Sequence, residues 1–167
     1  MVCVAMDRLW APWRGVYLSA EKNGECLFCA APLEKDDEKN FIFERRTFVY
    51  GILNKFPYNS GHIMISPFRH VTSLNGLDVE EWSEMLDLMK ASVKILDDLM
   101  HPRGYNFGIN QGGAVSGAGF EHLHMHIVPR WEGDTNFMPV LADTKVMSQH
   151  LDHVYHSIVG SLKKNEK

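Results

Sequence analysis

The sequence predicts one α+β domain built on an antiparallel sheet, and three observations support this fold class. Segments rich in aromatic and β-branched residues at 41–44, 47–53 and 62–66 are separated by turn formers, as in strands joined by hairpins. An amphipathic stretch at 78–100 has the spacing of a long helix. The chain has 167 residues without an internal repeat or a linker-like tract, which is the size of one domain.

The helix at 78–100 is the most clearly marked element. Asp78 followed three residues later by Glu81 matches a capping box, and Pro102 and Gly104 end the helical pattern. The apolar residues that recur at helical spacing, and that we expect to face the core, are Val79, Trp82, Met85, Leu86, Met89, Val93 and Leu96.

Two more strands and a second helix are expected after this helix. The strands cover 105–110 and 122–129, on either side of a glycine-rich loop at 111–119, and apolar spacing predicts a helix at 145–162. Before the sheet, we expect an aromatic arm at 8–17, a loop with paired cysteines at 24–33 and a charged turn at 35–40.

Composition and charge exclude several classes of function. A formal net charge of −4 gives no bulk attraction to long nucleic acids, although a local cluster of histidines and backbone N–H groups can hold a small anion. The sequence shows neither a signal-peptide pattern nor an apolar run long enough to cross a membrane, so we expect a cytoplasmic protein without a membrane partner. Three cysteines are too few for a secreted disulfide framework.

Three histidines share one side of the strand at 122–129. Because side chains alternate between the two faces of a strand, His122, His124 and His126 project to one face and the apolar residues between them to the other. Core packing gives no reason for three imidazoles in register. Such a row either holds a metal ion or presents one imidazole as a nucleophile that the others orient.

The glycine-rich loop favours the second of these chemistries. The loop at 111–119 contains four glycines. They let the backbone approach a ligand closely and turn N–H groups toward it, which suits a phosphate. The loop has no Gly-Lys-Ser/Thr sequence and is therefore not a Walker loop.

The segment His122-Leu123-His124-Met125-His126-Ile127-Val128 matches the His-x-His-x-His-x-x signature with apolar x. The chain thereby resembles the histidine triad (HIT) superfamily of nucleotide hydrolases and transferases, from 41 to about 137. The arm at 8–10 and the segments at 58–62 and 129–137 are similar to its bacterial diadenosine tetraphosphate phosphorylases.

The resemblance implies an architecture for the whole chain. We expect a single HIT domain over 1–167, with an N-terminal arm and cysteine loop at 1–40, a core at 41–137 and a C-terminal helix at 138–167. The family fold is a five-stranded antiparallel sheet with helices, paired into a homodimer that shares an extended sheet.

The resemblance also implies a role for each matching polar residue. His124 would attack the α-phosphorus of a nucleotide or dinucleoside polyphosphate and form a nucleotidyl-histidine intermediate. His126 and His62 would contact phosphate oxygens and orient His124, and Asn54 would bind the ribose hydroxyls. The residues expected to line the phosphate site are Gln111, Ser116 and Gly117.

The Cys26-Leu27-Phe28-Cys29 segment allows three interpretations. It could be a redox dithiol, which normally accompanies a βαβ pattern that is not evident here, a pair of structural thiols, or half of a tetrahedral zinc site. Zinc-containing histidine-triad proteins and the related hexose-1-phosphate uridylyltransferases complete such a site with two histidines. The resemblance therefore implies a closed structural zinc site formed by Cys26, Cys29, His70 and His122.

The resemblance leaves the substrate open. The expected substrate is a dinucleoside polyphosphate cleaved by phosphate or by water. Magnesium is expected only as an ion bound to the substrate phosphates. The alternatives are a nucleoside phosphoramidate hydrolase, a nucleotide-binding regulatory protein with little turnover, and a metalloenzyme that uses the three-histidine row. Ala118 stands where dinucleoside triphosphate hydrolases carry glutamine, and Leu123 and His126 depart from the His-Pro-His-x-Gln signature of hexose-1-phosphate nucleotidyltransferases.

Overall fold

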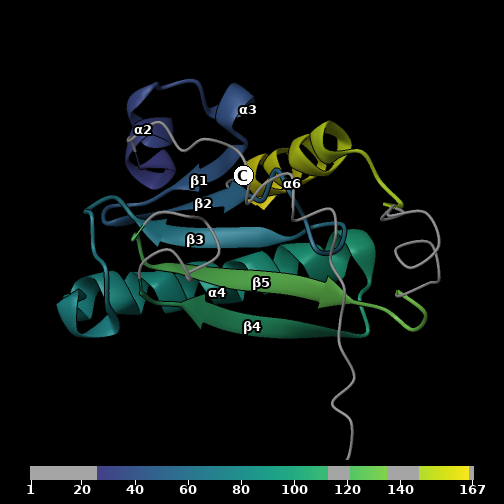
Figure 1. Cartoon of the computed structure of the whole chain (residues 1–167). Helices are drawn as coiled ribbons and strands as arrows, with labels where there is room; N and C mark the ends of the chain where they lie inside the picture. The colour runs from purple at the N-terminus through teal and green to yellow at the C-terminus, as the bar shows by residue number, and fades with distance from the viewer. Residues whose placement is uncertain (1–25, 113–120, 135–146, 166–167) are drawn as a thin grey trace, which may run out of the picture.

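The chain folds around a five-stranded antiparallel sheet, seen in the computed structural model of Figure 1. The structure describes residues 26–112, 121–134 and 147–165. The strands in chain order are β1 (Ile42–Arg45), β2 (Val49–Leu53), β3 (Ile63–Pro67), β4 (Gly104–Asn110) and β5 (His124–Arg130). Every neighbouring pair is antiparallel, and the order across the sheet is β1-β2-β3-β5-β4. The predicted fold class is confirmed.

The first three strands form the hairpin-linked antiparallel array that the sequence predicts. After β3 the chain passes through a short 3-10 turn, η1 (Leu74–Gly76), and the long helix α4 (Val79–Met100), and returns as the edge strand β4. The last strand, β5, then lies between β4 and β3. Residues far apart in the chain are therefore neighbours at the centre of the sheet.

One face of the sheet is covered by α4 and the C-terminal helix α6 (Leu151–Asn165), and Figure 1 shows α4 behind β4 and β5. The helix α4 starts as predicted, because the Glu81 carboxylate accepts the N–H of Asp78 at 2.9 Å. Fully or nearly fully buried residues of the main core include Leu53, Ile65, Met85, Leu88, Leu96, Ile127 and Ile158.

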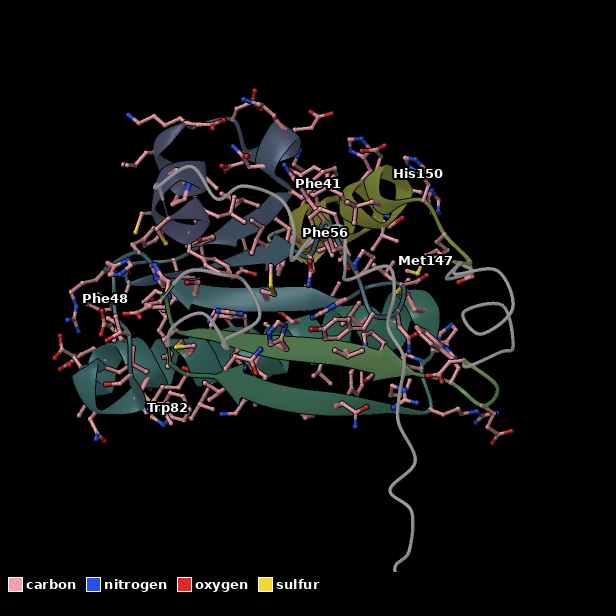
Figure 2. All side chains as sticks on the ribbon, in the orientation of Figure 1. Phe41, Phe48, Phe56, Trp82, Met147 and His150 are labelled. Atoms are coloured by element: carbon pink, nitrogen blue, oxygen red, sulfur yellow. The ribbon has the colours of Figure 1, made fainter. Side chains whose placement is uncertain are left out.

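A carboxylate joins α4 to the turn between β1 and β2. Glu84 accepts hydrogen bonds from the backbone N–H groups of Thr47, Phe48 and Val49, at 3.1, 2.6 and 3.1 Å. Figure 2 shows Phe48 and Trp82 on the same side of the molecule, where this contact lies. Three donors of a tight turn that the sheet does not pair are satisfied in this way.

The other face of the sheet carries α2 (Leu27–Leu33), which is followed by the one-turn helix α3 (Asp37–Asn40). The Tyr50 hydroxyl in β2 donates to the carbonyl of Phe28 at 2.8 Å and ties α2 to the sheet. A smaller core lies here, formed by Phe28, Ala31, Ile42, Tyr50, Ile52 and Met64.

Several local predictions were wrong. The cysteine segment is helical from Leu27, because Phe28 and Ala31, three residues apart, both bury their side chains. The charged turn contains α3, whose first turn is capped by the Asp36 carboxylate. The C-terminal helix starts at Leu151 rather than at 145.

Two further expectations about individual residues need correction. Val79 is 81% exposed rather than in the core, because as the first residue of α4 it precedes the part of the helix that meets the sheet. His122 and Leu123 precede β5 instead of opening it. No helix within the described ranges is long and apolar enough to cross a membrane. The aromatic arm at 8–17 lies outside the described residues.

Candidate active site and metal cluster

The alternation of side chains places the histidines on the face of the sheet that α2 covers. His126 pairs with Met64, and Met64 pairs with Ile52, and both apolar residues belong to the smaller core around Phe28. Met125 and Ile127 point the other way and are part of the main core. The division of β5 into a histidine face and an apolar face is as the sequence predicts.

His62 and His126 form a directed chain of hydrogen bonds. The N–H of Tyr58 lies 3.1 Å from His62 Nδ1 and can only donate, so the neutral His62 ring carries its proton on Nε2. His62 Nε2 lies 2.9 Å from His126 Nδ1, to which it donates. His126 therefore carries its proton on Nε2, which lies 3.1 Å from Asn110 Nδ2, and the two groups hydrogen-bond only when the Asn110 amide is turned so that its oxygen faces His126. These bonds make His126 Nε2 a donor.

His124 has the opposite arrangement. Its Nδ1 lies 2.8 Å from the carbonyl oxygen of His122, which can only accept, so Nδ1 carries the proton and Nε2 has a lone pair. Among the described side chains, His124 Nε2 is one of three buried polar atoms without a hydrogen-bond partner. Burial lowers the pKa of His124, so the ring stays neutral at neutral pH.

Aromatic contacts hold the three imidazoles in place. The Phe28 ring stacks on His124 with ring centroids 4.6 Å apart and an interplanar angle of 26°. The His126 ring meets His124 edge-on at 4.7 Å, and the Tyr58 ring lies 4.6 Å from His62. His62, His124 and His126 are all at least nine-tenths buried.

A separate cluster lies beside His124 and joins Cys26, Cys29, His70 and His122. Their ligand atoms are all within 4.8 Å of one another. Cys26 Sγ lies 3.4 Å and Cys29 Sγ 3.5 Å from His122 Nδ1, and Cys29 Sγ lies 3.3 Å from His70 Nδ1. Neighbouring ligands of a tetrahedral zinc ion with thiolate and imidazole donors are about 3.6 Å apart, so the spacing fits such an ion.

The hydrogen bonds of His122 favour a metal ligand. Its Nε2 lies 3.1 Å from the carbonyl oxygen of Pro67 and donates to it, which leaves the lone pair of Nδ1 directed at the two sulfurs. Burial lowers the pKa of His122 to about 4, which keeps the ring neutral, as a ligand must be. Two thiols and two imidazoles form the donor set that zinc prefers in closed sites.

The remaining predicted site residues are only partly placed. Asn54 lies beside the histidine chain, with Nδ2 3.3 Å from His62 Nδ1 and with Oδ1 accepting the N–H of Phe56 at 2.9 Å. Gln111 Oε1 accepts the N–H of Leu74 at 2.8 Å, on the segment that precedes α4. The predicted phosphate residues Ser116 and Gly117 lie outside the described residues.

Sequence reasoning missed three residues of this site, namely Phe28, Tyr58 and Asn110. Asn110 ends β4 directly opposite His124, a placement that depends on the pairing of β4 with β5 and that the spacing does not reveal. Tyr58 was noted only within the 58–62 segment that carries the resemblance, without a role of its own, although it stands four residues before His62. Phe28 was visible only as a residue between two cysteines.

The arrangement combines a neutral, desolvated lone pair on His124 with a donor proton on the adjacent His126. This combination suits attack on an electrophile whose oxygens accept hydrogen bonds, as those of a phosphoryl group do. A five-stranded antiparallel sheet that presents such a histidine row on one face defines a histidine-triad protein.

Comparison with known proteins agrees with this class. The sequence pattern of the HIT domain matches residues 34–133, and the chain belongs to the HIT domain family. It is 35% identical over 154 residues to the AP-4-A phosphorylase of Mycobacterium tuberculosis, a match that covers 87% of this chain and 79% of that protein. It is 27% identical to the asymmetrical bis(5'-nucleosyl)-tetraphosphatase of Schizosaccharomyces pombe, over 56% of this chain and 50% of that protein.

Solved structures share the fold. A zinc-bound histidine triad family protein from Mycobacterium smegmatis superposes with a TM-score of 0.66 at 22% identity, covering 85% of this chain and 96% of that one. The diadenosine triphosphate hydrolase of Plasmodium falciparum superposes with a TM-score of 0.62 at 22% identity, covering 77% and 80% of the two chains.

Proposed function

We propose that the protein cleaves a phosphoanhydride bond of dinucleoside polyphosphates through a nucleotidyl intermediate on His124. The observation that carries this proposal is the His124 Nε2 atom, which is unprotonated, buried and without a partner in the described residues. The similarity to an AP-4-A phosphorylase and to a bis(5'-nucleosyl)-tetraphosphatase supports the choice of substrate.

The reaction divides into two displacements at the α-phosphorus. His124 Nε2 attacks, a P–N bond forms, and the P–O bond to the remaining phosphates breaks as the leaving nucleotide takes its electron pair. The ring then carries a positive charge, which the His122 carbonyl stabilises through the Nδ1 proton of His124. Phosphate or water next attacks the phosphorus, the P–N bond breaks, and the lone pair returns to Nε2; when water attacks, the proton it loses passes to the solvent.

The other polar residues would bind and orient the substrate. The donor proton on His126 Nε2 would contact a phosphate oxygen, with His62 fixing its position through the 2.9 Å bond to His126 Nδ1. Asn110, whose Nδ2 lies 3.1 Å from His126 Nε2, would donate to the phosphate as well. Asn54 would bind the ribose hydroxyls, and the residues that would line the phosphate site are Gln111, Ser116 and Gly117. Gln111 would do so through its amide nitrogen, since its oxygen is bound to Leu74.

The cysteine cluster would hold a structural zinc ion on Cys26, Cys29, His70 and His122. With all four positions filled by protein ligands, such an ion supplies no open site for substrate and serves to fix the ligand segments. Magnesium would take part only as a companion of the substrate phosphates.

The quaternary structure and location belong to the same proposal. The strand β4 is an edge of the sheet, and Phe107 on it is 51% exposed. An edge strand with an exposed aromatic residue favours pairing with a second copy, which would give a homodimer with one continuous sheet. We place this protein in the cytoplasm.

The test is incubation of the purified protein with diadenosine tetraphosphate, with and without inorganic phosphate, and separation of the products by anion exchange. ADP and ATP formed only with phosphate would identify a phosphorylase, and AMP and ATP formed without it a hydrolase. Failure to turn over in either condition would overturn the proposal. Adenosine phosphoramidate is the next substrate to try, because the chain is 24% identical over 111 residues to the adenosine 5'-monophosphoramidase of Candida albicans.

A further inference from the structure

Phe28 joins the cysteine cluster to the reactive histidine. We infer that Phe28 is a positioning residue, whose ring keeps the His124 imidazole in the orientation that presents Nε2 to the phosphorus. This inference rests on the proposed role of His124 as the nucleophile. Phe28 is itself neither one of the proposed metal ligands nor the proposed nucleophile.

The contact between the two rings is close and buried. The centroids of Phe28 and His124 are 4.6 Å apart with an interplanar angle of 26°, and neither side chain is exposed. Phe28 also lies 5.5 Å from the His122 ring. A stacked neighbour covers a face of the imidazole and leaves its edge, where Nε2 lies, uncovered by Phe28.

Only one hydrogen bond orients His124 in the described structure, the 2.8 Å bond from Nδ1 to the His122 carbonyl. A single bond fixes one atom of the ring but allows the ring to tilt about it. The Phe28 ring removes that freedom, because tilting would drive the imidazole into the stacked ring. The hydrogen bond, the stacking and the edge-on contact of the His126 ring at 4.7 Å together define the direction of Nε2.

Phe28 is itself held on several sides. Its carbonyl accepts the Tyr50 hydroxyl at 2.8 Å, and its side chain is enclosed by the smaller core. Cys26 and Cys29 flank it, and the N–H groups of Cys29 and Ala30 both bond to the Cys26 carbonyl, at 3.0 and 2.9 Å. The segment that carries the two sulfurs of the cluster is thus the segment that carries the ring.

The matched control is Phe68, an aromatic residue packed against the same smaller core. Its ring stacks on Tyr50 at 5.1 Å rather than on a histidine. Phe28→Leu and Phe68→Leu make the same substitution at one cluster, but Phe28 is fully buried and Phe68 only partly, so a structural role predicts a larger loss of stability at Phe28 and no loss of kcat per folded, metal-loaded protein in either variant. Metal content and thermal unfolding of both variants show whether each is folded and loaded.

The kinetic arm compares turnover with affinity for a non-hydrolysable dinucleoside polyphosphate analogue. A displaced nucleophile loses rate without losing binding, so Phe28→Leu should lower kcat roughly 10- to 100-fold and change the analogue Kd less than threefold. Phe68→Leu should leave both values within about threefold of the wild type. Wild-type kcat in Phe28→Leu, or an equal loss in Phe68→Leu, would overturn the inference.

The spectroscopic arm does not depend on turnover. Long-range ¹H–¹⁵N spectra of the metal-loaded protein distinguish a protonated from an unprotonated ring nitrogen. The wild type should show His124 as a single form with the proton on Nδ1, and Phe28→Leu should show a mixture of the two neutral forms. An unchanged His124 spectrum would contradict the positioning role. If the wild type turns over no dinucleoside polyphosphate, the proposed function fails, and these spectra still decide the role of Phe28.

Discussion

Arg69 pairs with both carboxylate oxygens of Glu81, with Nε 3.0 Å from Oε1 and Nη2 2.6 Å from Oε2. Glu81 is buried in the first turn of α4, and Arg69 directly precedes the proposed metal ligand His70. The pair fixes the segment that carries His70 to the start of the longest helix.

This pair predicts a pH-dependent contribution to stability. The Arg69 partner lowers the pKa of Glu81, so its contribution is complete above the usual carboxyl value of 4.5 and is lost as the pH falls through the lower value of the folded state. Glu81→Gln should lower the free energy of unfolding at pH 7 by about 1–3 kcal/mol and should reduce the loss between pH 5 and pH 3. Urea denaturation at these pH values checks both effects. The exposed neighbour Glu80→Gln should change little, and an equal effect in both variants would contradict the prediction.

Replacing His124 should abolish catalysis and keep the fold. We expect His124→Ala to lower turnover of diadenosine tetraphosphate by about four orders of magnitude, because the substitution removes the imidazole that supplies the attacking lone pair. Binding of a non-hydrolysable analogue, measured by calorimetry, should persist. The exposed His156→Ala is the control and should retain wild-type turnover. Substantial turnover by His124→Ala would remove the nucleotidyl-histidine mechanism.

Metal analysis should show whether a metal ion binds the cysteine cluster or the row of three histidines, since His122 belongs to both. Protein purified with zinc should contain about one ion per chain, and the double variant Cys26→Ser/Cys29→Ser should contain almost none. Cys3→Ser should keep its zinc. If the double variant retained its metal, the ion would be bound to the histidine row, and this result would support the metalloenzyme interpretation instead. Chelation should also lower the thermal midpoint, since the ion binds only the folded state.

Gly51 should not tolerate a side chain. A methyl group at this position would meet the Phe43 ring, with two ring carbons only 2.8 Å away, so that the ring would have to move within the main core. We expect Gly51→Ala to cost about 1–3 kcal/mol in thermal or urea unfolding. In α6, Gly160 has no atom within 4 Å of an added methyl group, so Gly160→Ala should stabilise the protein by about 0.5–1 kcal/mol. If Gly51→Ala were the more stable of the two variants, Gly51 would not be packed against the Phe43 ring as described.

Pairing through β4 should be sensitive to charge at Phe107. In sedimentation experiments we expect the wild type to be a dimer and Phe107→Glu to shift toward the monomer, because a buried carboxylate at the new interface would lack a partner. Val79→Glu introduces the same charge at an exposed position on α4 and should leave the dimer intact. A monomeric wild type would rule out the shared sheet.

The sequence predicted the parts of the fold that depend on local patterns. The helix α4 and its Glu81 cap follow from spacing within a few residues, and so does the division of β5 between His124 on one face and Met125 on the other. The cysteine segment was wrongly predicted as a loop. Its helix α2 has only seven residues, too few to be stable alone, and it is stabilised by the burial of Phe28 in the smaller core.

The parts that escaped prediction depend on contacts between distant segments. The insertion of β5 between β3 and β4 has no local signal, and it alone brings Asn110 opposite His124. Phe28 was recognisable only once α2 lay on the histidine face. The ligands His70 and His122 came from the resemblance, and their distances to the sulfurs needed the folded chain.

The strand order also has a consequence for synthesis of the chain. His62 and His126 are 64 residues apart and can bond only when β5 has reached β3. At ordinary translation rates of 5–20 residues per second, β3 waits roughly 3–13 s for its partner after leaving the ribosome. During that time one edge of β3 is open, and α4 is the element available to shield its apolar face. The hydrogen bond between the two histidines is thus a marker of the completed sheet.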